Sequence, residues 1–495
     1  MPDMHGYPLG KVPALRSDTR FSAFWLLPVS LLHRASCLLL SLLAVPALSA
    51  PLPPLGPIDA GTLALWVAPL DGGPPVYTHR ADAAVNPAST MKLVTSFAAL
   101  DTLGPDFHWQ TGLYSSAPVN GTSLAGDLYW RGNGDPAFDF DALADLTGQL
   151  RDRGIRRIDG ALLLDKSAFT SLGSSSEQDP DEGRTYQVGP DPLLTQYKTA
   201  AVRLYAGDSG WQVVLDPPLR GIDTRNRLTL TPGACTGGVG RHVSASAQER
   251  NLVLNGKVPA GCDGSVLYVP LLDHDTFQAA AFDAVWQERS GQTGLPVRRG
   301  NAPADARLLA SHESPPLSEV LVGLNHYSNN VMARQVFLTL GASDGNGGDT
   351  VRNAEAAVRA ALTRHGIDSR AFVFENGAGL SRRERVTAGA LGELLRAAQR
   401  APFWGEFAAL LPRPGGAGTL HQRLPALAGR ARFKTGTLND VHALAGYLDA
   451  GGRRYALVAI VNASGIRNSA LDSLVERIAA ALDAQQVQDR PVAGR

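Results

Sequence analysis

Lysine is scarce in this chain. The 46 basic residues are overwhelmingly arginine, and lysine occurs only at Lys11, Lys92, Lys166, Lys198, Lys257 and Lys434. Arginine stays protonated in a folded protein and cannot act as a base, whereas the amine of a lysine can be made to titrate. Among these lysines, only Lys92 has a serine three residues before it. Lys92 is therefore the first candidate for a reactive amine.

An excess of charge of either sign is also absent. The 46 basic residues are balanced by 46 acidic ones, and the formal net charge is zero. Proteins that bind nucleic acid normally carry a basic excess, so this balance argues against a nucleic-acid partner. The 495 residues are enough for one large core or for about two to three domains.

Only three cysteines are present. Cys37 falls in an apolar run near the N-terminus, which leaves Cys235 and Cys262 for the rest of the chain. In an exported protein we expect this pair to form one disulfide, with two free buried thiols as the alternative. The spacing offers no Cys/His cluster of the kind that holds zinc, and we expect no metal site.

The first fifty residues are typical of a targeting segment. A His-Arg pair precedes the apolar run 37–43, and small residues stand before Pro51. We predict a signal peptide at residues 1–50, and therefore export. A further apolar stretch at 21–32 makes this region long, so a translation start near Val29 and a single membrane anchor are alternatives.

The residues around Ser89 place a hydroxyl and an amine one helical turn apart. Pro87 suits the first helical position and Asn86 the N-cap, so we predict Ser89 in the first turn of a helix. Lys92 is then its neighbour on the helix surface. The apolar face of this helix would be Leu93, Phe97 and Leu100. A serine nucleophile needs an adjacent base, which a lysine of lowered pKa can supply, although a solvated surface lysine is the alternative.

The pattern of apolar and turn-forming residues divides the rest of the chain into regions. Short strands and turns fill residues 106–270, which we predict to be a mainly β insert between residues 51–105 and 271–485, with a flexible tail at 486–495. Strands are predicted at Thr62–Val67, Val76–His79, Arg430–Thr437, Val441–Ala450 and Arg454–Val461. Helices are predicted at Asp275–Ser290, Leu317–Leu340, Val351–His365, Ala388–Arg400 and Ser469–Ala484.

A second polar group lies in the run Asn325–Arg334. A tight turn entering a helix would aim Ser328 and Asn330 into one cleft, where the hydroxyl can relay a proton and the amide can hold a peptide group. The same run also fits a plain helix N-cap. Tyr327 with Asn329 offers a competing frame, with a phenol as the proton relay.

A third group falls in the predicted strand at Phe433–Leu438. Gly436 removes a side chain where a ligand would approach the strand backbone. Lys434 offers a cation, and Thr435 and Thr437 offer hydroxyl donors, for binding a carboxylate. A strand-end glycine beside an exposed lysine is the simpler interpretation.

Three such groups in this order are typical of penicillin-binding proteins and β-lactamases. The chain resembles, over essentially its whole length after the signal peptide, the low-molecular-mass class C penicillin-binding proteins, a D-alanyl-D-alanine carboxypeptidase/endopeptidase family of serine peptidases (family S13). The wide gap from Ser89 to Ser328 is part of the resemblance, which extends to Gly132–Pro136, Glu375–Arg382 and Gly418–Leu420. The chain departs from the family pattern at Asn329 and Asn376–Ala378, where Asp and Asp-Gly-Ser are common.

The resemblance implies an α+β fold of the broad α/β class. A transpeptidase-like domain with a five-stranded antiparallel sheet flanked by helices would be interrupted by accessory β lobes. It also implies acyl transfer on D-alanyl-D-alanine peptides of peptidoglycan, with Ser89 as nucleophile, Lys92 as general base and Ser328 as proton relay. The implied substrate-binding residues are Asn330, Lys434, Thr435, Gly436 and Thr437.

The resemblance further implies how the protein meets its ligands. β-Lactams would acylate the same serine, and no cofactor would be needed. The protein would work in the periplasm, with at most peripheral membrane association, and a homodimer is left open. A serine β-lactamase is one alternative, although such enzymes are typically more compact. A catalytically silent peptidoglycan-binding scaffold is another. A Ser-His-Asp protease is disfavoured because the 11 histidines form no compelling local motif.

Overall fold

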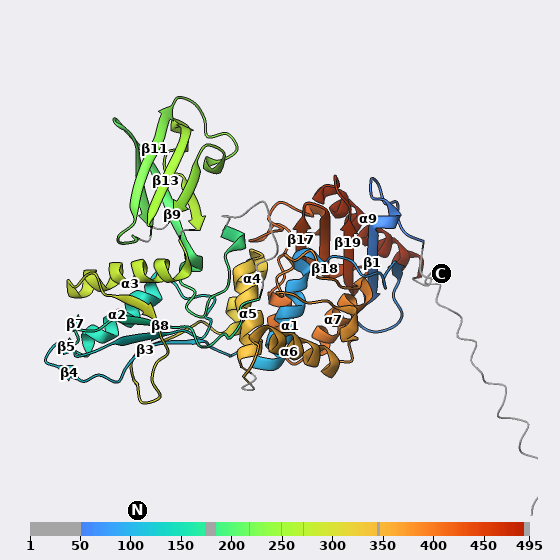
Figure 1. Ribbon diagram of the computed structural model, residues 1–495. Helices are drawn as coiled ribbons and strands as arrows, with labels where there is room; N and C mark the ends of the chain where they lie inside the picture. Colours follow the sequence, from blue (N-terminus) through green and yellow to red (C-terminus); the bar gives the residue numbers. More distant parts are fainter. Residues whose placement is uncertain are drawn as a thin grey trace, which may run out of the picture. The chain divides into compact units, whose positions relative to one another are not determined.

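Figure 1 shows the computed structural model, which describes residues 51–173, 185–216, 218–248, 250–270, 272–343 and 347–489. The predicted signal peptide, residues 1–50, and residues 490–495 of the predicted tail lie outside this description, so both stay predictions. Within the described ranges, no helix combines the length and the apolar character that crossing a bilayer requires.

One antiparallel sheet brings the two ends of the chain together. Its strand order is β17-β18-β19-β1-β2, and every neighbouring pair is antiparallel. The strands are β1 (Leu63–Pro69), β2 (Tyr77–His79), β17 (Ala431–Leu438), β18 (Val441–Ala450) and β19 (Arg453–Asn462). Strand β1 and most of β18 and β19 are buried on both faces, which explains their continuous apolar sequences. The predicted five-stranded antiparallel sheet is confirmed.

Helices cover both faces of this sheet, as Figure 1 shows around β17, β18 and β19. On one face, Trp66 and Val458 belong to a core that includes Phe97 and Leu391 of the helices. On the other face, Leu457 shares a core with the last helix, α9. The helices are α1 (Met91–Leu103), α4 (Leu317–His326), α5 (Asn330–Ala342), α6 (Thr350–Arg364), α7 (Ala388–Arg400), α8 (Trp404–Ala409) and α9 (Asn468–Asp489).

Two of the predicted helices differ from those observed. The stretch Leu317–Leu340 is divided into α4 and α5, because Ser328 has a left-handed backbone with φ 56°. Asn329 then caps α5, its side-chain oxygen accepting a hydrogen bond from the Met332 N–H at 3.1 Å. Helix α9 extends to Asp489, beyond its predicted end and into the predicted tail.

The middle of the chain forms its own sheets around a separate core. The largest sheet has the order β15-β8-β6-β3-β16, and three smaller ones have the orders β10-β9-β14, β11-β13-β12 and β4-β5-β7. The first eight strands are β3 (Gln110–Ser115), β4 (Val119–Asn120), β5 (Ser123–Leu124), β6 (Leu128–Arg131), β7 (Arg157–Ile158), β8 (Leu162–Asp165), β9 (Thr199–Gly207) and β10 (Gly210–Asp216). The others are β11 (Asp223–Thr231), β12 (Ser244–Gln248), β13 (Asn251–Pro259), β14 (Val266–Pro270), β15 (Val297–Arg299) and β16 (Arg307–Glu313), together with helices α2 (Phe140–Asp152) and α3 (His274–Ser290). The predicted β-rich character of this part is therefore observed.

The inserted part runs further along the chain than the predicted boundary at residue 270. Strand β16 pairs with β3, and it ends only at Glu313. Helix α3 also follows residue 270, and its Phe282 and Trp286 lie in the same core as Trp130 of β6. Helical periodicity shows that α3 exists but does not reveal which core it joins.

Cys235 and Cys262 are joined by a disulfide, as predicted, so the alternative of two free thiols is wrong. Together with His242 they form the one group of potential metal ligands found among the described residues. Because both sulfurs are committed to the disulfide, this group cannot offer thiolates to a zinc ion.

Candidate active site

Ser89 lies in a 3₁₀ turn, Ala88–Thr90, that leads directly into α1. The prediction that Pro87 begins the helix with Asn86 as its cap is wrong. Ala88 has a left-handed backbone with φ 44°, which an α-helix cannot contain, so α1 begins only after this turn. Asn86 acts more locally, because its side-chain oxygen accepts a hydrogen bond from the Ala88 N–H at 2.9 Å.

Two glycines allow the surrounding chain to close on this turn. A Cβ atom on Gly379 would lie 1.9 Å from the carbonyl oxygen of Ala88, and one on Gly436 would lie 2.9 Å from that of Pro87. Gly379 also has φ 82°, a conformation that side chains other than glycine rarely adopt. Gly436, predicted to make room for a ligand, thus also makes room for the turn that carries Ser89.

Lys92 is fully buried, and its amine connects three segments of the chain. The Nζ atom donates to Ser89 Oγ at 3.0 Å, to Asn330 Oδ1 at 2.6 Å and to the carbonyl oxygen of Ala378. Burial lowers the pKa of Lys92 to about 7, although the negative charge of Glu384 opposes that shift. An amine with this pKa is largely neutral slightly above pH 7 and can accept a proton. The alternative of a solvated surface lysine is wrong.

Ser328 and Lys434 form the second contact of the site. The amine of Lys434 donates to Ser328 Oγ at 2.8 Å and to the carbonyl oxygen of Thr435 at 2.9 Å. Lys434 is fully buried, so the simpler interpretation of an exposed lysine is wrong. Burial, together with the positive charges of Lys92 and Arg423, holds the pKa of Lys434 well below its ordinary value.

The structure separates the two frames proposed for the second motif. The side chain of Tyr327 is 69% exposed, and that of Asn329 is used as the cap of α5. Ser328 and Asn330 instead reach Lys434 and Lys92, respectively. The serine and carboxamide frame is the one that meets the other two motifs.

Strand β17 is an edge strand, which leaves one row of its backbone groups without a strand partner. The N–H of Phe433 donates outside the sheet, to the carbonyl oxygen of Pro412 at 3.0 Å. Backbone groups of alternate residues on a strand point to the same side, so the N–H groups of Thr435 and Thr437 also point away from β18. The Thr435 hydroxyl donates to that of Thr419 at 2.9 Å, and Thr437 is exposed.

Sequence reasoning missed Glu384, a fully buried carboxylate that acts electrostatically on Lys92. Its Oε1 atom accepts hydrogen bonds from the backbone N–H groups of residues 375–377, at 3.3, 3.1 and 3.0 Å. Glu384 therefore shapes the loop whose Ala378 carbonyl receives the Lys92 amine. Burial raises the pKa of Glu384, while those backbone donors and Lys92 oppose the shift. Burial also lowers the pKa of nearby Arg334 to about 10, an effect that Glu384 opposes.

The two lysines of the site lack an ion-pair partner within the described part of the chain. No carboxylate oxygen there lies within 4.0 Å of the amine of Lys92 or Lys434. The two amines therefore have no carboxylate in direct contact among these residues, and the carboxylate that acts on Lys92, Glu384, does so from a greater distance.

The site contains two pairs of side chains, Ser89 with the buried Lys92, and Ser328 with Lys434 on the edge strand of a five-stranded antiparallel sheet. This arrangement defines the penicillin-binding class of serine hydrolases. Within that class, residues 53–485 match the model of the D-Ala-D-Ala carboxypeptidase 3 (S13) family, and the chain belongs to this family. The resemblance inferred from the three motifs is confirmed, and with it the prediction of a D-alanyl-D-alanine carboxypeptidase.

Two curated relatives span most of the chain. A D-alanyl-D-alanine carboxypeptidase of Actinomadura sp. (strain R39) is 28% identical over 405 residues, which cover 76% of this chain and 73% of the relative. D-alanyl-D-alanine carboxypeptidase DacB of Haemophilus influenzae is 25% identical over 405 residues, covering 79% of this chain and 82% of the relative. Both similarities extend well beyond the motifs.

The fold also matches a solved structure. Penicillin-binding protein 4 (dacB) of Haemophilus influenzae superposes with a TM-score of 0.73 at 21% identity, covering 86% of this chain and 97% of that one. A structure of the same protein complexed with a β-lactam gives a TM-score of 0.68 at 20% identity, covering 85% and 96% of the two chains. These matches confirm the predicted fold.

Proposed function

We propose that this carboxypeptidase cleaves D-alanyl-D-alanine bonds through an acyl-enzyme on Ser89, and that it acts both on free stem peptides and on peptidoglycan cross-links. The observation that carries the proposal is the buried Lys92 amine, which lies 3.0 Å from the Ser89 hydroxyl and has a pKa of about 7. A serine hydroxyl becomes an effective nucleophile when a neutral base is within hydrogen-bonding distance.

In the acylation step, Ser89 Oγ bonds to the carbonyl carbon between the two D-alanines while neutral Lys92 takes the hydroxyl proton. The C–N bond then breaks, and the proton taken by Lys92 passes through Ser328, whose hydroxyl accepts a hydrogen bond from Lys434, to the departing amine, which leaves Lys92 neutral again. In the second step a water molecule attacks the ester carbonyl and gives a proton to Lys92. The ester C–O bond then breaks, Lys92 returns that proton to Ser89 Oγ, and the shortened peptide leaves.

Substrate binding would use the edge of β17. An extended peptide can add to the outward-pointing backbone groups of an edge strand, which would place it beside Thr435 and Thr437. Lys434 supplies positive potential for the terminal carboxylate, with the Thr437 hydroxyl as an added donor, and Gly436 lets the peptide approach. Asn330, already bonded to Lys92, would hold the peptide amide.

The oxyanion that forms during both steps would be bound by the backbone N–H groups of Ser89 and Thr437. The Thr437 N–H points outward from the sheet, as argued from the bonding of Phe433. One such donor typically changes the rate by a factor of ~10²–10³.

The same peptide bond chemistry would serve trimming and cross-link cleavage, and it predicts inhibition by β-lactams, whose amide presents a similar carbonyl to Ser89. A peptidoglycan substrate also agrees with the predicted export to the periplasm. Peripheral membrane association and a homodimer stay predictions.

Intact-mass spectrometry with benzylpenicillin tests the proposal. We expect a persistent adduct of one drug per chain, mapped to the peptide that contains Ser89, and release of D-alanine from a D-alanyl-D-alanine pentapeptide. A cross-linked muropeptide dimer assayed in parallel is expected to be split. Rapid loss of drug with a fleeting adduct would instead identify a β-lactamase, and absence of any adduct on folded protein would identify a silent scaffold.

Glu384→Gln is expected to change the pH dependence of acylation. The amide oxygen can still accept the backbone hydrogen bonds of residues 375–377, but the negative charge that raises the pKa of Lys92 is lost. The pKa of Lys92 should therefore fall, moving the acid limb of the acylation rate to lower pH by about one unit. The rate constant for benzylpenicillin acylation, measured from about pH 5 to 9, provides the readout.

The matched control is Glu393→Gln, since the Glu393 side chain on α7 is 48% exposed. This variant should keep the wild-type profile. The Glu384→Gln protein should first be shown to have a native circular dichroism spectrum. If the acid limb of its acylation rate then lies at the same pH as in the wild type, Glu384 has no electrostatic role.

A further inference from the structure

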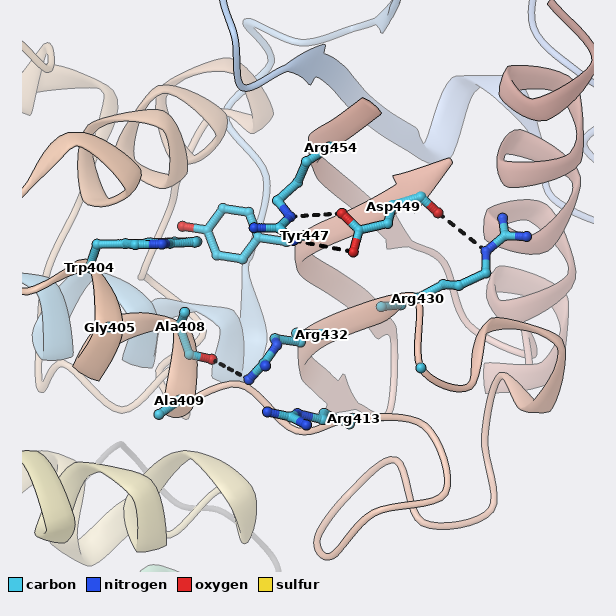
Figure 2. A pocket seen from close by; sticks show the side chains of 12 residues that line it. Trp404, Gly405, Ala408, Ala409, Arg413, Arg430, Arg432, Tyr447, Asp449 and Arg454 are labelled. Atoms are coloured by element: carbon cyan, nitrogen blue, oxygen red, sulfur yellow. Dashed lines mark hydrogen bonds and ion pairs between the residues drawn. The ribbon is translucent and has the colours of Figure 1, made fainter. Parts of the chain in front are cut away.

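A pocket of about 520 Å³ lies outside the three motifs. Figure 2 shows it between α8 and the first residues of β17, with β18 and β19 contributing side chains. Its lining includes Trp404, Arg413, Arg432, Tyr447, Asp449 and Arg454. None of the residues assigned above to catalysis or substrate binding is among them.

One side of this pocket is apolar and aromatic. The rings of Trp404 and Tyr447 meet edge to face, with centroids 4.9 Å apart and planes at 89° (Figure 2). The Tyr447 hydroxyl donates to the carbonyl oxygen of Leu395 at 2.9 Å, so it is already used within the protein. Tyr447 is only 3% exposed, so the ring surface on this side comes mainly from the half-buried Trp404.

The other side carries arginines whose charges are not all neutralised. Arg454 is paired with Asp449 at 2.7 Å, and Arg430 with Asp483 at 2.9 Å. Among the described residues, the Arg432 guanidinium donates only to the carbonyl oxygen of Ala408, at 3.2 Å. The guanidinium group of Arg413 has no hydrogen-bond or ion-pair partner within the described part of the chain, although its backbone carbonyl oxygen accepts a hydrogen bond from the Gly416 N–H at 3.0 Å.

The arginines also repel one another. The pKa of Arg432 is lowered first by burial and then by the positive charges of Arg413 and Arg454, and the charge of Asp449 opposes this shift. Asp449 also lines the pocket, but it is paired with Arg454, which leaves Arg413 and Arg432 without a carboxylate in ion-pairing distance among the described residues. A bound anion would relieve the repulsion between these guanidinium groups and accept charge-assisted hydrogen bonds from them.

We propose that this pocket, lined by Trp404, Arg413, Arg432 and Tyr447, binds an organic oxyanion, a carboxylate or a phosphate, carried on a planar or apolar body. Guanidinium groups bind either oxyanion in a bidentate manner, while the aromatic side takes up the body of the ligand. The site is separate from the catalytic one but lies on the same strand, since Arg432 precedes Lys434 by two residues.

Isothermal titration calorimetry of the mature protein tests the proposal. The probes are phenyl phosphate, phthalate and inorganic phosphate. We expect one phenyl phosphate or phthalate per chain, with inorganic phosphate at least about fivefold weaker because it cannot use the aromatic side. The ratio between phenyl phosphate and phthalate distinguishes a phosphate ligand from a carboxylate ligand. Absence of binding by both aromatic probes at about 5 mM would overturn the proposal.

Variants assign the binding to this pocket. Arg413→Ala and the double variant Arg413→Ala/Arg432→Ala should lose affinity for phenyl phosphate by about tenfold or more, as expected for charge-assisted hydrogen bonds. Arg352→Ala is the matched control. Arg352 lies on α6, where its side chain is 83% exposed, and this substitution removes one positive charge outside the pocket. Arg413 is exposed, so its replacement should not disturb folding. An unchanged affinity of Arg413→Ala for phenyl phosphate would contradict the assignment.

Prior acylation with benzylpenicillin separates the pocket from the catalytic site. Phenyl phosphate should bind the acylated protein with wild-type affinity, and Arg413→Ala should be acylated at the wild-type rate within about twofold. Loss of probe binding on acylation would overturn the proposal, since it would place the anion at Lys434 instead.

Discussion

Ser89→Ala is expected to abolish the formation of a covalent adduct with benzylpenicillin and to reduce D-alanine release by a factor on the order of 10⁴–10⁶, as when other serine hydrolases lose their nucleophile. The same change should alter the free energy of unfolding by less than about 1 kcal/mol, because the Ser89 side chain is only partly buried. The Ser89 hydroxyl has one hydrogen bond to the described residues, and it comes from Lys92.

Three measurements on the same preparation check this expectation. Intact mass after incubation with drug reports the adduct, a coupled assay reports D-alanine release, and a thermal melt reports stability. Ser116→Ala is a suitable control, since Ser116 is an exposed serine that bonds to Asp305 in the inserted part. An adduct that persists in Ser89→Ala, for example on Ser328, would assign the nucleophile to another residue.

Lys92→Arg should be nearly as damaging although it keeps the positive charge. A guanidinium group cannot be deprotonated in a protein, so it cannot accept the proton of Ser89. We expect acylation to slow by about 10²–10⁴-fold, the usual contribution of a general base. The buried Lys92 amine also donates hydrogen bonds to three acceptors at once, and the larger, planar guanidinium group cannot reproduce this geometry.

The pH dependence distinguishes loss of the base from simple misplacement. In the wild type, acylation should rise with pH through about 7, because the amine becomes neutral above its pKa. In Lys92→Arg, whatever acylation rate remains should not rise with pH through about 7. Lys257→Arg, a change at an exposed lysine of β13, should keep both rate and profile. Substantial activity with a wild-type limb in Lys92→Arg would refute Lys92 as the base.

The contact between Ser89 and Lys92 could be predicted from the sequence because its geometry is local. Ser89 and Lys92 are three residues apart, and any helical or 3₁₀ turn brings them together. The meeting of Lys92 with Asn330, 238 residues later in the chain, has no periodic signature. It was anticipated only through the resemblance to a family. The strands of the sheet could also be predicted from the sequence, since each of them is an apolar run between turn residues.

Other features escaped prediction because they depend on tertiary contacts. Glu384 acts on Lys92 through a loop conformation fixed by backbone hydrogen bonds, which no residue pattern encodes. The backbone at Ala88 is left-handed although alanine favours helices, because the packing of Gly379 and Gly436 decides it. The end of the inserted part was misjudged because β16 finds its partner β3 far back along the chain.

The sheet built from both ends of the chain has a consequence for biosynthesis. Strand β1 pairs with β19, and the backbone N–H of Asn86, just ahead of Ser89, donates to the side chain of Asn462, 376 residues later. Contacts of such long range form slowly, and a ribosome delivers the C-terminal partner last. The segment that carries Ser89 therefore cannot reach its observed geometry while the chain is still being made. A nascent chain is expected to lack carboxypeptidase activity until its final strands have emerged.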